Sequence, residues 1–216
     1  SIPAMPDFTC ETCEASFSLS QAVVDRYPGW TPRFCRAHGK KKGGAAKGGT
    51  RSPQSREEHL TLTEVLQRYS GGPQDGVFTD GSCSPNPGPG GWGVVWVGGG
   101  EVLGQAHGQA ADTTNNRMEL QALIEALKLI DADAELTVYS DSQLCVNTIN
   151  QWAAGWARRG WTRKSGPIKN LDLVQPLYAL AQARPKVKLA WLAAHSGNLW
   201  NEYADSLATA WMRAEL

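Results

Sequence analysis

The sequence lacks any long apolar run and any excess of charge of one sign. Its longest apolar stretches, such as residues 94–97, are far shorter than the roughly 20 residues that span a bilayer. The first seven residues show neither the basic nor the apolar region of a signal peptide. We therefore expect a cytoplasmic protein, monomeric and without a membrane partner.

Extreme composition is absent as well. With 41% hydrophobic and 19% charged residues, the chain is ordinary globular material, which excludes disordered, collagen-like and coiled-coil proteins. A length of 216 residues predicts one full domain and a small extra module.

The net charge of zero conceals regions of opposite sign. Residues 1–56 carry nine Lys and Arg against four Asp and Glu, whereas residues 57–75 carry one against four. Residues 152–169 hold five cations and no acid, interleaved with three tryptophans. Such a basic and aromatic patch is typical of a surface that meets a phosphate backbone.

The five cysteines do not suit a set of disulfides, because their number is odd and three of them lie within the first forty residues. Cys10 and Cys13 form a Cys-x2-Cys pair, and Cys35 and His38 form a Cys-x2-His pair twenty-one residues further on. Two such pairs predict a closed, structural zinc site in a module at residues 1–38. The alternative is a set of free thiols in a small core, with His38 opening a basic tail.

Two connecting segments follow. Residues 39–56 are dominated by Gly, Lys and Ser and are predicted to form a flexible linker, whose lysines serve either as a solvated tether or as an electrostatic contact with nucleic acid. Residues 57–75 are predicted to be a helical lead-in, because Leu62, Val65, Leu66 and Tyr69 have helical spacing and glycines follow.

Residues 76–216 show alternating strand and helix patterns. Strands are predicted at residues 77–80, 92–97, 101–108, 136–140 and 187–192, and a turn rich in Gly and Pro is predicted at residues 81–91. Helices are predicted at residues 116–130, 143–152 and 173–183 and around residues 204–211. The first of them carries an apolar stripe of Leu120, Leu123, Ile124 and Leu127 on one face. The order βββαβαβα predicts an α/β fold with a five-stranded mixed sheet flanked by helices.

Four acids in this layout are candidates for a metal site. Asp80 and Asp141 end predicted strands, Glu119 lies early in the first helix, and Asp205 borders the buried face of the last helix. Carboxylates gathered in this way form an oxygen-rich site for hard cations such as Mg²⁺. Each acid also has a simpler explanation: Asp80 in a turn, Glu119 in a capping box with Asn116, Asp141 in a helix cap, and Asp205 as surface charge.

Five ordered blocks resemble type 1 ribonuclease H, the family that cuts the RNA strand of RNA/DNA hybrids and leaves 5′-phosphate and 3′-hydroxyl ends. The blocks are Thr79-Asp80-Gly81-Ser82-Cys83 with Asn86-Pro87-Gly88-Pro89-Gly90-Gly91-Trp92-Gly93; Thr113-Thr114-Asn115-Asn116-Arg117-Met118-Glu119-Leu120; Ser140-Asp141-Ser142-Gln143; Trp156-Ala157-Arg158-Arg159-Gly160-Trp161; and His195-Ser196-Gly197 with Asn201-Glu202-Tyr203-Ala204-Asp205. The resemblance covers residues 76–216 and implies the ribonuclease H-like fold.

The resemblance also implies roles for individual residues. Asp80, Glu119, Asp141 and Asp205 would hold two Mg²⁺ ions, with Mn²⁺ as a substitute, and His195 would assist proton transfer or product release. The implied contacts with the hybrid are Cys83, Asn86, Thr114, Asn115, Asn116, Gln143, Trp152, Arg158, Arg159, Arg163 and Lys164. The zinc module has no counterpart in the minimal enzyme.

Two other functions remain open on the sequence. One is a catalytically silent hybrid-binding module, which loss of a metal carboxylate would favour; none of the four is lost. The other is a DNA-cutting transposase or integrase relative on the same fold, against which the asparagine-rich blocks and the basic patch argue.

Overall fold

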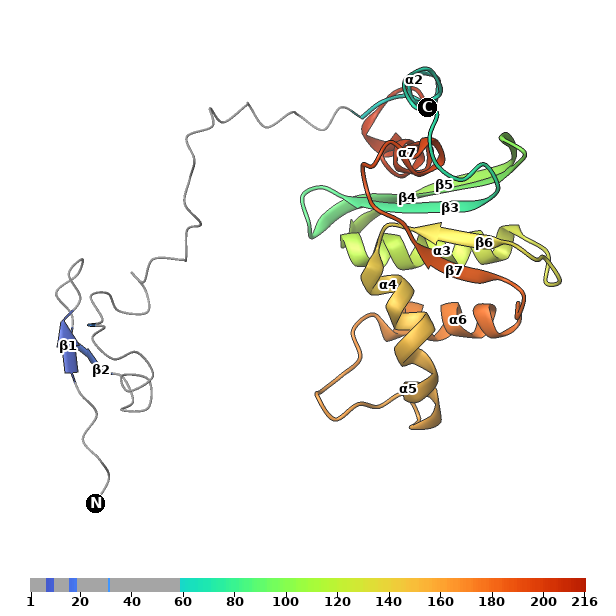
Figure 1. Cartoon of the computed structure of the whole chain (residues 1–216). Coiled ribbons are helices and arrows are strands. Elements are labelled where there is room, and N and C mark those ends of the chain that lie inside the picture. The colour runs from blue at the N-terminus through green and yellow to red at the C-terminus, as the bar shows by residue number, and fades with distance from the viewer. Residues whose placement is uncertain (1–6, 10–15, 19–30, 32–58) are drawn as a thin grey trace. The chain divides into compact units, whose positions relative to one another are not determined.

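The computed structural model describes residues 7–9, 16–18, 31 and 59–216, and it divides the chain into two compact units, Ser1–Arg56 and Glu57–Leu216 (Figure 1). In the first unit, β1 (Asp7–Thr9) pairs antiparallel with β2 (Ser16–Ser18). The predicted linker lies outside the described residues. So do the four predicted zinc ligands, Cys10, Cys13, Cys35 and His38.

The second unit contains a five-stranded mixed sheet in the order β5-β4-β3-β6-β7 (Figure 1). Its strands are β3 (Gly76–Cys83), β4 (Gly88–Gly98), β5 (Glu101–Thr113), β6 (Thr137–Ser140) and β7 (Lys188–Trp191). The first three strands are antiparallel neighbours, whereas β6 runs parallel to β3 and β7 parallel to β6. The predicted mixed sheet is confirmed.

Helices cover both faces of this sheet. They are α2 (Leu62–Arg68), α3 (Asn115–Leu129), α4 (Gln143–Asn147), α5 (Ala154–Arg158), α6 (Leu171–Gln182) and α7 (Leu199–Ala208). Figure 1 shows α2 and α7 on one face and α3 and α6 on the other. In the part of the chain that the structure describes, no helix is both long and apolar enough to cross a membrane.

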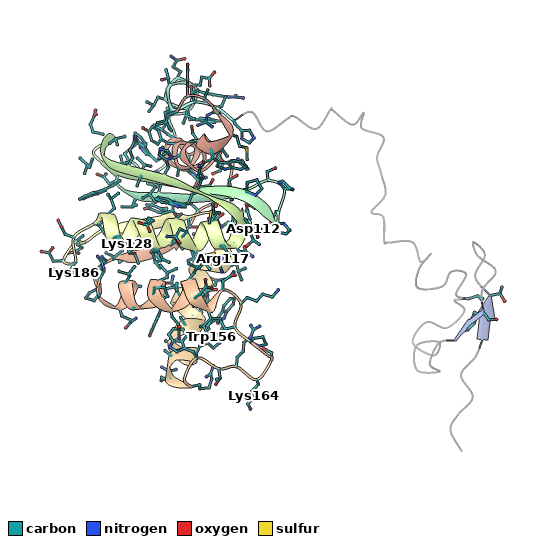
Figure 2. The ribbon with its side chains drawn as sticks, turned by 180° about the vertical axis from the view of Figure 1, so that it is seen from behind. Asp112, Arg117, Lys128, Trp156, Lys164 and Lys186 are labelled. Atoms are coloured by element: carbon teal, nitrogen blue, oxygen red, sulfur yellow. The ribbon has the colours of Figure 1, made fainter. Side chains whose placement is uncertain are left out.

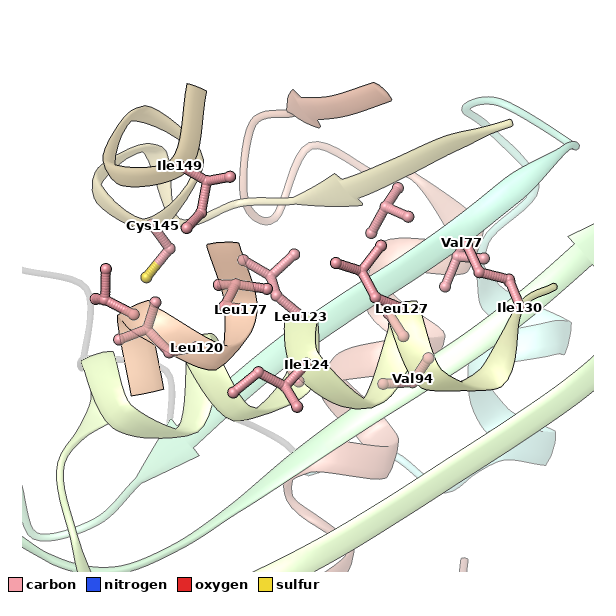
Figure 3. Close-up of a cluster of buried hydrophobic side chains, with 14 of the residues drawn as sticks. Val77, Val94, Leu120, Leu123, Ile124, Leu127, Ile130, Cys145, Ile149 and Leu177 are labelled. Carbon is pink, nitrogen blue, oxygen red and sulfur yellow. The ribbon is translucent and has the colours of Figure 1, made fainter. Parts of the chain in front are cut away.

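The apolar stripe predicted on the first helix faces the core. Leu123 and Leu127 of α3 are fully buried against Val77 of β3 and Leu177 of α6, as Figure 3 shows. A second cluster on the opposite face packs Val65 of α2 with residues of α7 and the sheet. The central strands β3 and β4 are therefore covered on both faces, which holds their ends in fixed positions.

Three predicted details differ from the structure. The Gly-rich stretch predicted as a turn at residues 81–91 is largely strand, because its glycines lie in the paired ends of β3 and β4. The helix predicted at residues 143–152 continues to Arg158 through a π-helical segment, Thr148–Ala153. The capping box suggested for Glu119 and Asn116 is wrong: Thr114 is the N-cap of α3, and its side chain accepts from the Arg117 N–H.

Candidate active site

Two of the candidate acids lie side by side on neighbouring strands. Strands β3 and β6 are parallel, with Thr79 opposite Ser140. Asp80 and Asp141 are the next residues along each chain, so they lie at the same level of neighbouring strands. Asp80 is 6% exposed, although it is a carboxylate.

Gly81 explains how Glu119 reaches this point. A Cβ atom at position 81 would lie 2.2 Å from the backbone nitrogen of Glu119, closer than atoms of two residues can approach. The missing side chain lets α3 touch β3, and the Gly81 N–H donates to the Glu119 carboxylate. Glu119 is consequently buried directly beside Asp80.

A second glycine brings in Asp205. Gly93 of β4 is paired with Asp80, and a Cβ on it would lie 2.3 Å from the carbonyl oxygen of Ala204. Helix α7 therefore packs on the backbone of β4. Asp205 consequently lies close enough to Asp80 for the two carboxyl groups to interact, and this interaction raises the pKa of Asp80.

The three acids Asp80, Glu119 and Asp141 offer oxygen atoms that all lie within 4.8 Å of one another. One oxygen of Glu119, Oε2, is buried and has no hydrogen-bond partner. Because an unpaired buried carboxylate oxygen is costly, this arrangement fits a site whose missing partner is a cation. All-oxygen donors suit Mg²⁺ and Mn²⁺.

Electrostatics within the cluster support the same fit. Burial raises the pKa of Asp80 well above its usual value, and the charges of Glu119, Asp141 and Asp205 raise it further. Burial likewise raises the pKa of Glu119 well above its ordinary range, with added repulsion from Asp141 and Asp205. Burial also raises the pKa of Asp141, although a hydrogen bond from Asn201 opposes the shift. Divalent cations would relieve this repulsion.

We expect the metal-free protein to lose thermal stability as the pH rises above about 4, the ordinary pKa of a carboxyl group in the unfolded chain. In this window the folded carboxyls, with their raised pKa values, keep protons that the unfolded chain has already released. The folded state then binds more protons, so the free energy of unfolding falls as the pH rises. Differential scanning fluorimetry in EDTA measures the trend.

Mg²⁺ should flatten this pH dependence, because the cation binds the ionised, folded site. Glu119→Gln is the matched control: it removes one buried titrating group and should weaken the trend in EDTA. The pKa of Asp172, lowered by its hydrogen bond from Arg117, places its titration below this pH window. A melting temperature that rises with pH in EDTA would contradict the expectation.

His195 lies at the rim of the acidic cluster. Its backbone has φ of +46°, its side chain is 69% exposed, and its Nδ1 atom is 3.9 Å from Oε2 of Glu202. Glu202 and Asn201 were not predicted to be site residues, yet both are buried at this site and Asn201 hydrogen-bonds Asp141. The available signal was helical spacing, since both share a face of α7 with Asp205.

The predicted hybrid contacts in the first blocks lie at the ends of three elements. Cys83 ends β3, and Asn86 lies in the β3–β4 turn, where its Oδ1 accepts from the Asn115 N–H at 3.3 Å. Thr114 caps α3, and Gln143 begins α4 two residues after Asp141. The exposed members of this set are Asn86, Asn115, Asn116 and Gln143.

The basic patch forms a separate projection built on the π-helix, α5 and the loop after it. Figure 2 shows Trp156 and Lys164 at the end of the unit that is remote from the sheet. Trp152 is 38% exposed and lies 6.1 Å from Trp156 between ring centroids. Trp161 instead packs edge-on against Tyr178 of α6, so it supports the projection from within. Arg158, Arg159 and Lys164 are exposed and Arg163 is half-buried.

Comparison with known proteins agrees with this geometry. The family model described as RNase H matches residues 73–213. The chain belongs to the RNase H family. It is 48% identical over 133 residues to a ribonuclease H of Janthinobacterium sp. (strain Marseille), covering 61% of this chain and 91% of that protein. It is 49% identical over 133 residues to a ribonuclease H of Agrobacterium fabrum, covering 61% and 90% respectively.

Among solved structures, the RNase H unit is similar to LC9-RNase H1, a type 1 RNase H with the type 2 active-site motif. The TM-score is 0.55 and the sequence identity 35%, and the match covers 65% of this chain and 74% of that one. The family model matches the chain only from residue 73 onward, so it does not include the N-terminal unit.

Proposed function

We propose that this protein is a ribonuclease H that hydrolyses the RNA strand of RNA/DNA hybrids. The observation that carries the proposal is the convergence of Asp80, Glu119 and Asp141 on one point, with Asp205 joined to Asp80, in a chain that belongs to the RNase H family. A catalytically silent module would have no need to keep buried, mutually repelling acids.

The four carboxylates would hold divalent cations, and His195 would move a proton beside them. When bound, such cations activate an attacking water and stabilise the leaving 3′ oxygen of a phosphodiester. Asp80 lies centrally in the cluster, between Asp141 on the next strand and Glu119 on α3. Asn201 holds Asp141 in place by donating to its carboxylate. His195 is exposed to solvent and is near Glu202, which suits exchange of a proton with water.

Recognition of the hybrid would use amides around the acids and cations on the projection. Amide side chains both donate and accept, so they suit the 2′-hydroxyls and base edges displayed in a shallow minor groove. Asn86, Asn115, Asn116 and Gln143 are exposed beside the cluster, with Cys83 and Thr114 next to them. The projection would contact the phosphate backbone of the hybrid through Trp152, Arg158, Arg159, Arg163 and Lys164.

Cleavage of three labelled duplexes tests the function. The full chain should cut an RNA/DNA hybrid in Mg²⁺ and leave double-stranded RNA and double-stranded DNA intact, because the 2′-hydroxyl and the deoxyribose are needed on different strands. EDTA should abolish the cleavage, and excess Mg²⁺ or Mn²⁺ should restore it. Cleavage of double-stranded DNA would favour an integrase-like activity, and hybrid binding without cleavage would favour the silent module.

We further propose a structural zinc in the N-terminal unit, held by Cys10, Cys13, Cys35 and His38. The sequence supports it through two ligand pairs, and the residues between the paired strands β1 and β2 include Cys10 and Cys13. The remaining two cysteines lie elsewhere: Cys83 beside the acidic cluster and Cys145 in the core of the second unit. Burial raises the pKa of the Cys145 thiol to about 12, which excludes it as a thiolate ligand at neutral pH.

Metal analysis of the full chain should find about one zinc ion per molecule. Cys13→Ser should lose the zinc, because three ligands hold the ion far less tightly than four, while cleavage of short hybrids in Mg²⁺ persists. Cys83→Ser is the matched control and should keep the zinc. A zinc content of zero in the wild type, or equal zinc content in wild type and Cys13→Ser, would overturn the proposed module.

A further inference from the structure

The loop that carries His195 is bound by a second segment from far away in the sequence. Residues 193–198 connect β7 to α7, and residues 71–74 connect α2 to β3. Gly71 and Asn198 form an isolated parallel bridge, and the Leu199 N–H donates to the Gly71 carbonyl at 2.8 Å. Residues 71–74 therefore lie alongside the start of α7.

Glycine is required for this close approach. A Cβ on Gly72, which has φ of +90°, would lie 2.4 Å from Oδ1 of Asn198. A Cβ on Gly71 would lie 3.1 Å from the carbonyl oxygen of Gly197. The two backbones are in contact, so a displacement of one segment must displace the other.

A buried side-chain pair fixes the same junction. The indole of Trp200 is 3% exposed, and its N–H donates to Oε1 of Gln74 at 3.1 Å. Gln74 in turn donates from Nε2 to the Gly72 carbonyl at 3.1 Å. The main-chain carbonyl of Gln74 accepts from the Gly100 N–H at 2.9 Å. Gln74 thus links the first turn of α7 to the β4–β5 turn, which belongs to the rigid sheet.

Helix α2 anchors residues 71–74 from the other side. Val65 is 2% exposed and belongs to one apolar cluster with Trp200, Tyr203 and Leu207 of α7. The Ser206 hydroxyl donates to the Leu60 carbonyl at 2.6 Å. Residues 60–74 are therefore packed along the outer face of the helix that carries Asp205.

Hydrogen bonds continue from this junction into the loop that carries His195. Asn198 donates from Nδ2 to the Ser196 hydroxyl at 2.6 Å, and that hydroxyl donates to the Ala193 carbonyl at 2.7 Å. Ser196 is the neighbour of His195, whose φ is positive. The loop conformation at His195 is therefore connected to residues 71–74 through Asn198.

We infer that residues 71–74 position the His195 loop for catalysis, with Gln74 and Trp200 as positioning residues that act through that loop. The inference rests on the proposed hybrid cleavage and on the role of His195 in it. Gln74 touches neither the acidic cluster nor the predicted hybrid contacts among its described hydrogen bonds, so its effect on turnover must pass through the junction.

Steady-state cleavage in saturating Mg²⁺ tests the inference on the full chain. Gln74→Leu removes the acceptor of the Trp200 N–H and should lower kcat roughly three- to tenfold, with KM for the hybrid unchanged within about twofold. Gln74→Glu keeps an acceptor oxygen at this position and should restore most of kcat. In a His195→Ala background, Gln74→Leu should lower kcat no further, because the group that it positions is gone.

Ser206→Ala is the matched control. It breaks the bond that ties Leu60, just before α2, to α7 away from the loop, so it should lower the melting temperature by as much as Gln74→Leu while kcat stays unchanged. If the double variant Gln74→Leu with His195→Ala lost kcat by the product of the two single losses, the inference would be overturned. An equal loss of kcat in Ser206→Ala would overturn it as well, because the loss would then reflect stability alone.

Amide hydrogen exchange separates this inference from the proposed function. Gln74→Leu should accelerate exchange within residues 193–199, whereas Ser206→Ala should leave exchange there unchanged. A wild type that cuts no hybrid would overturn the proposed function, and the exchange data would still decide whether residues 71–74 hold the loop. Unaltered exchange in Gln74→Leu would overturn the positioning even in an active enzyme.

Discussion

Asp80→Asn should lower hybrid cleavage by at least about 1,000-fold, which corresponds to roughly 4 kcal/mol of transition-state stabilisation. The asparagine keeps the shape of the side chain but removes the negative charge at the centre of the cluster, next to Glu119, Asp141 and Asp205. The same change removes repulsion, so the variant should melt at a higher temperature than the wild type in EDTA. Lost activity together with raised stability cannot be explained by unfolding.

Cleavage in Mg²⁺ and hybrid binding by fluorescence anisotropy in Ca²⁺ measure the two sides of this expectation. Binding should change little, because the basic projection is untouched. Asp75→Asn is the matched control: Asp75 is exposed just before β3 and accepts from the Gly99 N–H through Oδ1, an atom that asparagine keeps. Near-normal turnover in Asp80→Asn would remove Asp80 from the catalytic site.

Replacing Arg158, Arg159, Arg163 and Lys164 together by Ala should weaken hybrid binding about 10- to 100-fold near 0.1 M salt. Cations that neutralise phosphates release counterions, so the slope of log K against log salt should also become shallower, by up to about 0.9 for each phosphate that the variant no longer neutralises. At saturating hybrid, kcat should stay near the wild-type value, because the projection is remote from the acids. Anisotropy titrations at several salt concentrations measure both quantities.

Two double variants separate the effect of the projection from the effect of losing positive charge anywhere on the surface. Arg158→Ala with Lys164→Ala removes two exposed cations from the projection, and Lys128→Ala with Lys186→Ala removes two exposed cations elsewhere. Figure 2 shows Lys128 and Lys186 far from Lys164. The first pair should reduce the salt slope and the second should not. An equal change in both pairs would mean that the projection is only a solvated surface.

The fold of the second unit could be predicted from the sequence because its helices and strands carry strong local patterns of apolar residues. The stripe of Leu120, Leu123, Ile124 and Leu127 has the period of a helix with one buried face, and that face is buried. The π-helix at residues 148–153 was not predicted, because one extra residue in a turn changes hydrogen bonding without a distinctive side-chain pattern.

The acidic cluster was also predictable, since Asp80 and Asp141 each end a predicted strand and neighbouring strand ends meet at one edge, although β3 in fact continues to Cys83. What the sequence did not disclose is the contribution of Asn201 and Glu202, because a polar residue on a helix is usually solvent-exposed. Their burial depends on the packing of α7 against β4 at Gly93, a contact between segments far apart in the chain. The contact between residues 71–74 and Asn198 was hidden for the same reason.

The close approach of α3 to β3 at Gly81 also bears on which cation the acids accept. Mg²⁺ binds oxygen at about 2.1 Å and Ca²⁺ at about 2.4 Å, and carboxylates serve both, so ligand type alone does not separate the two ions. The distance between Glu119 and Asp80 is limited by a backbone contact that admits no Cβ atom at position 81. The separation of the two backbones that carry Asp80 and Glu119 is therefore set by the packing of main chain on main chain, which is far stiffer than any rotatable side chain.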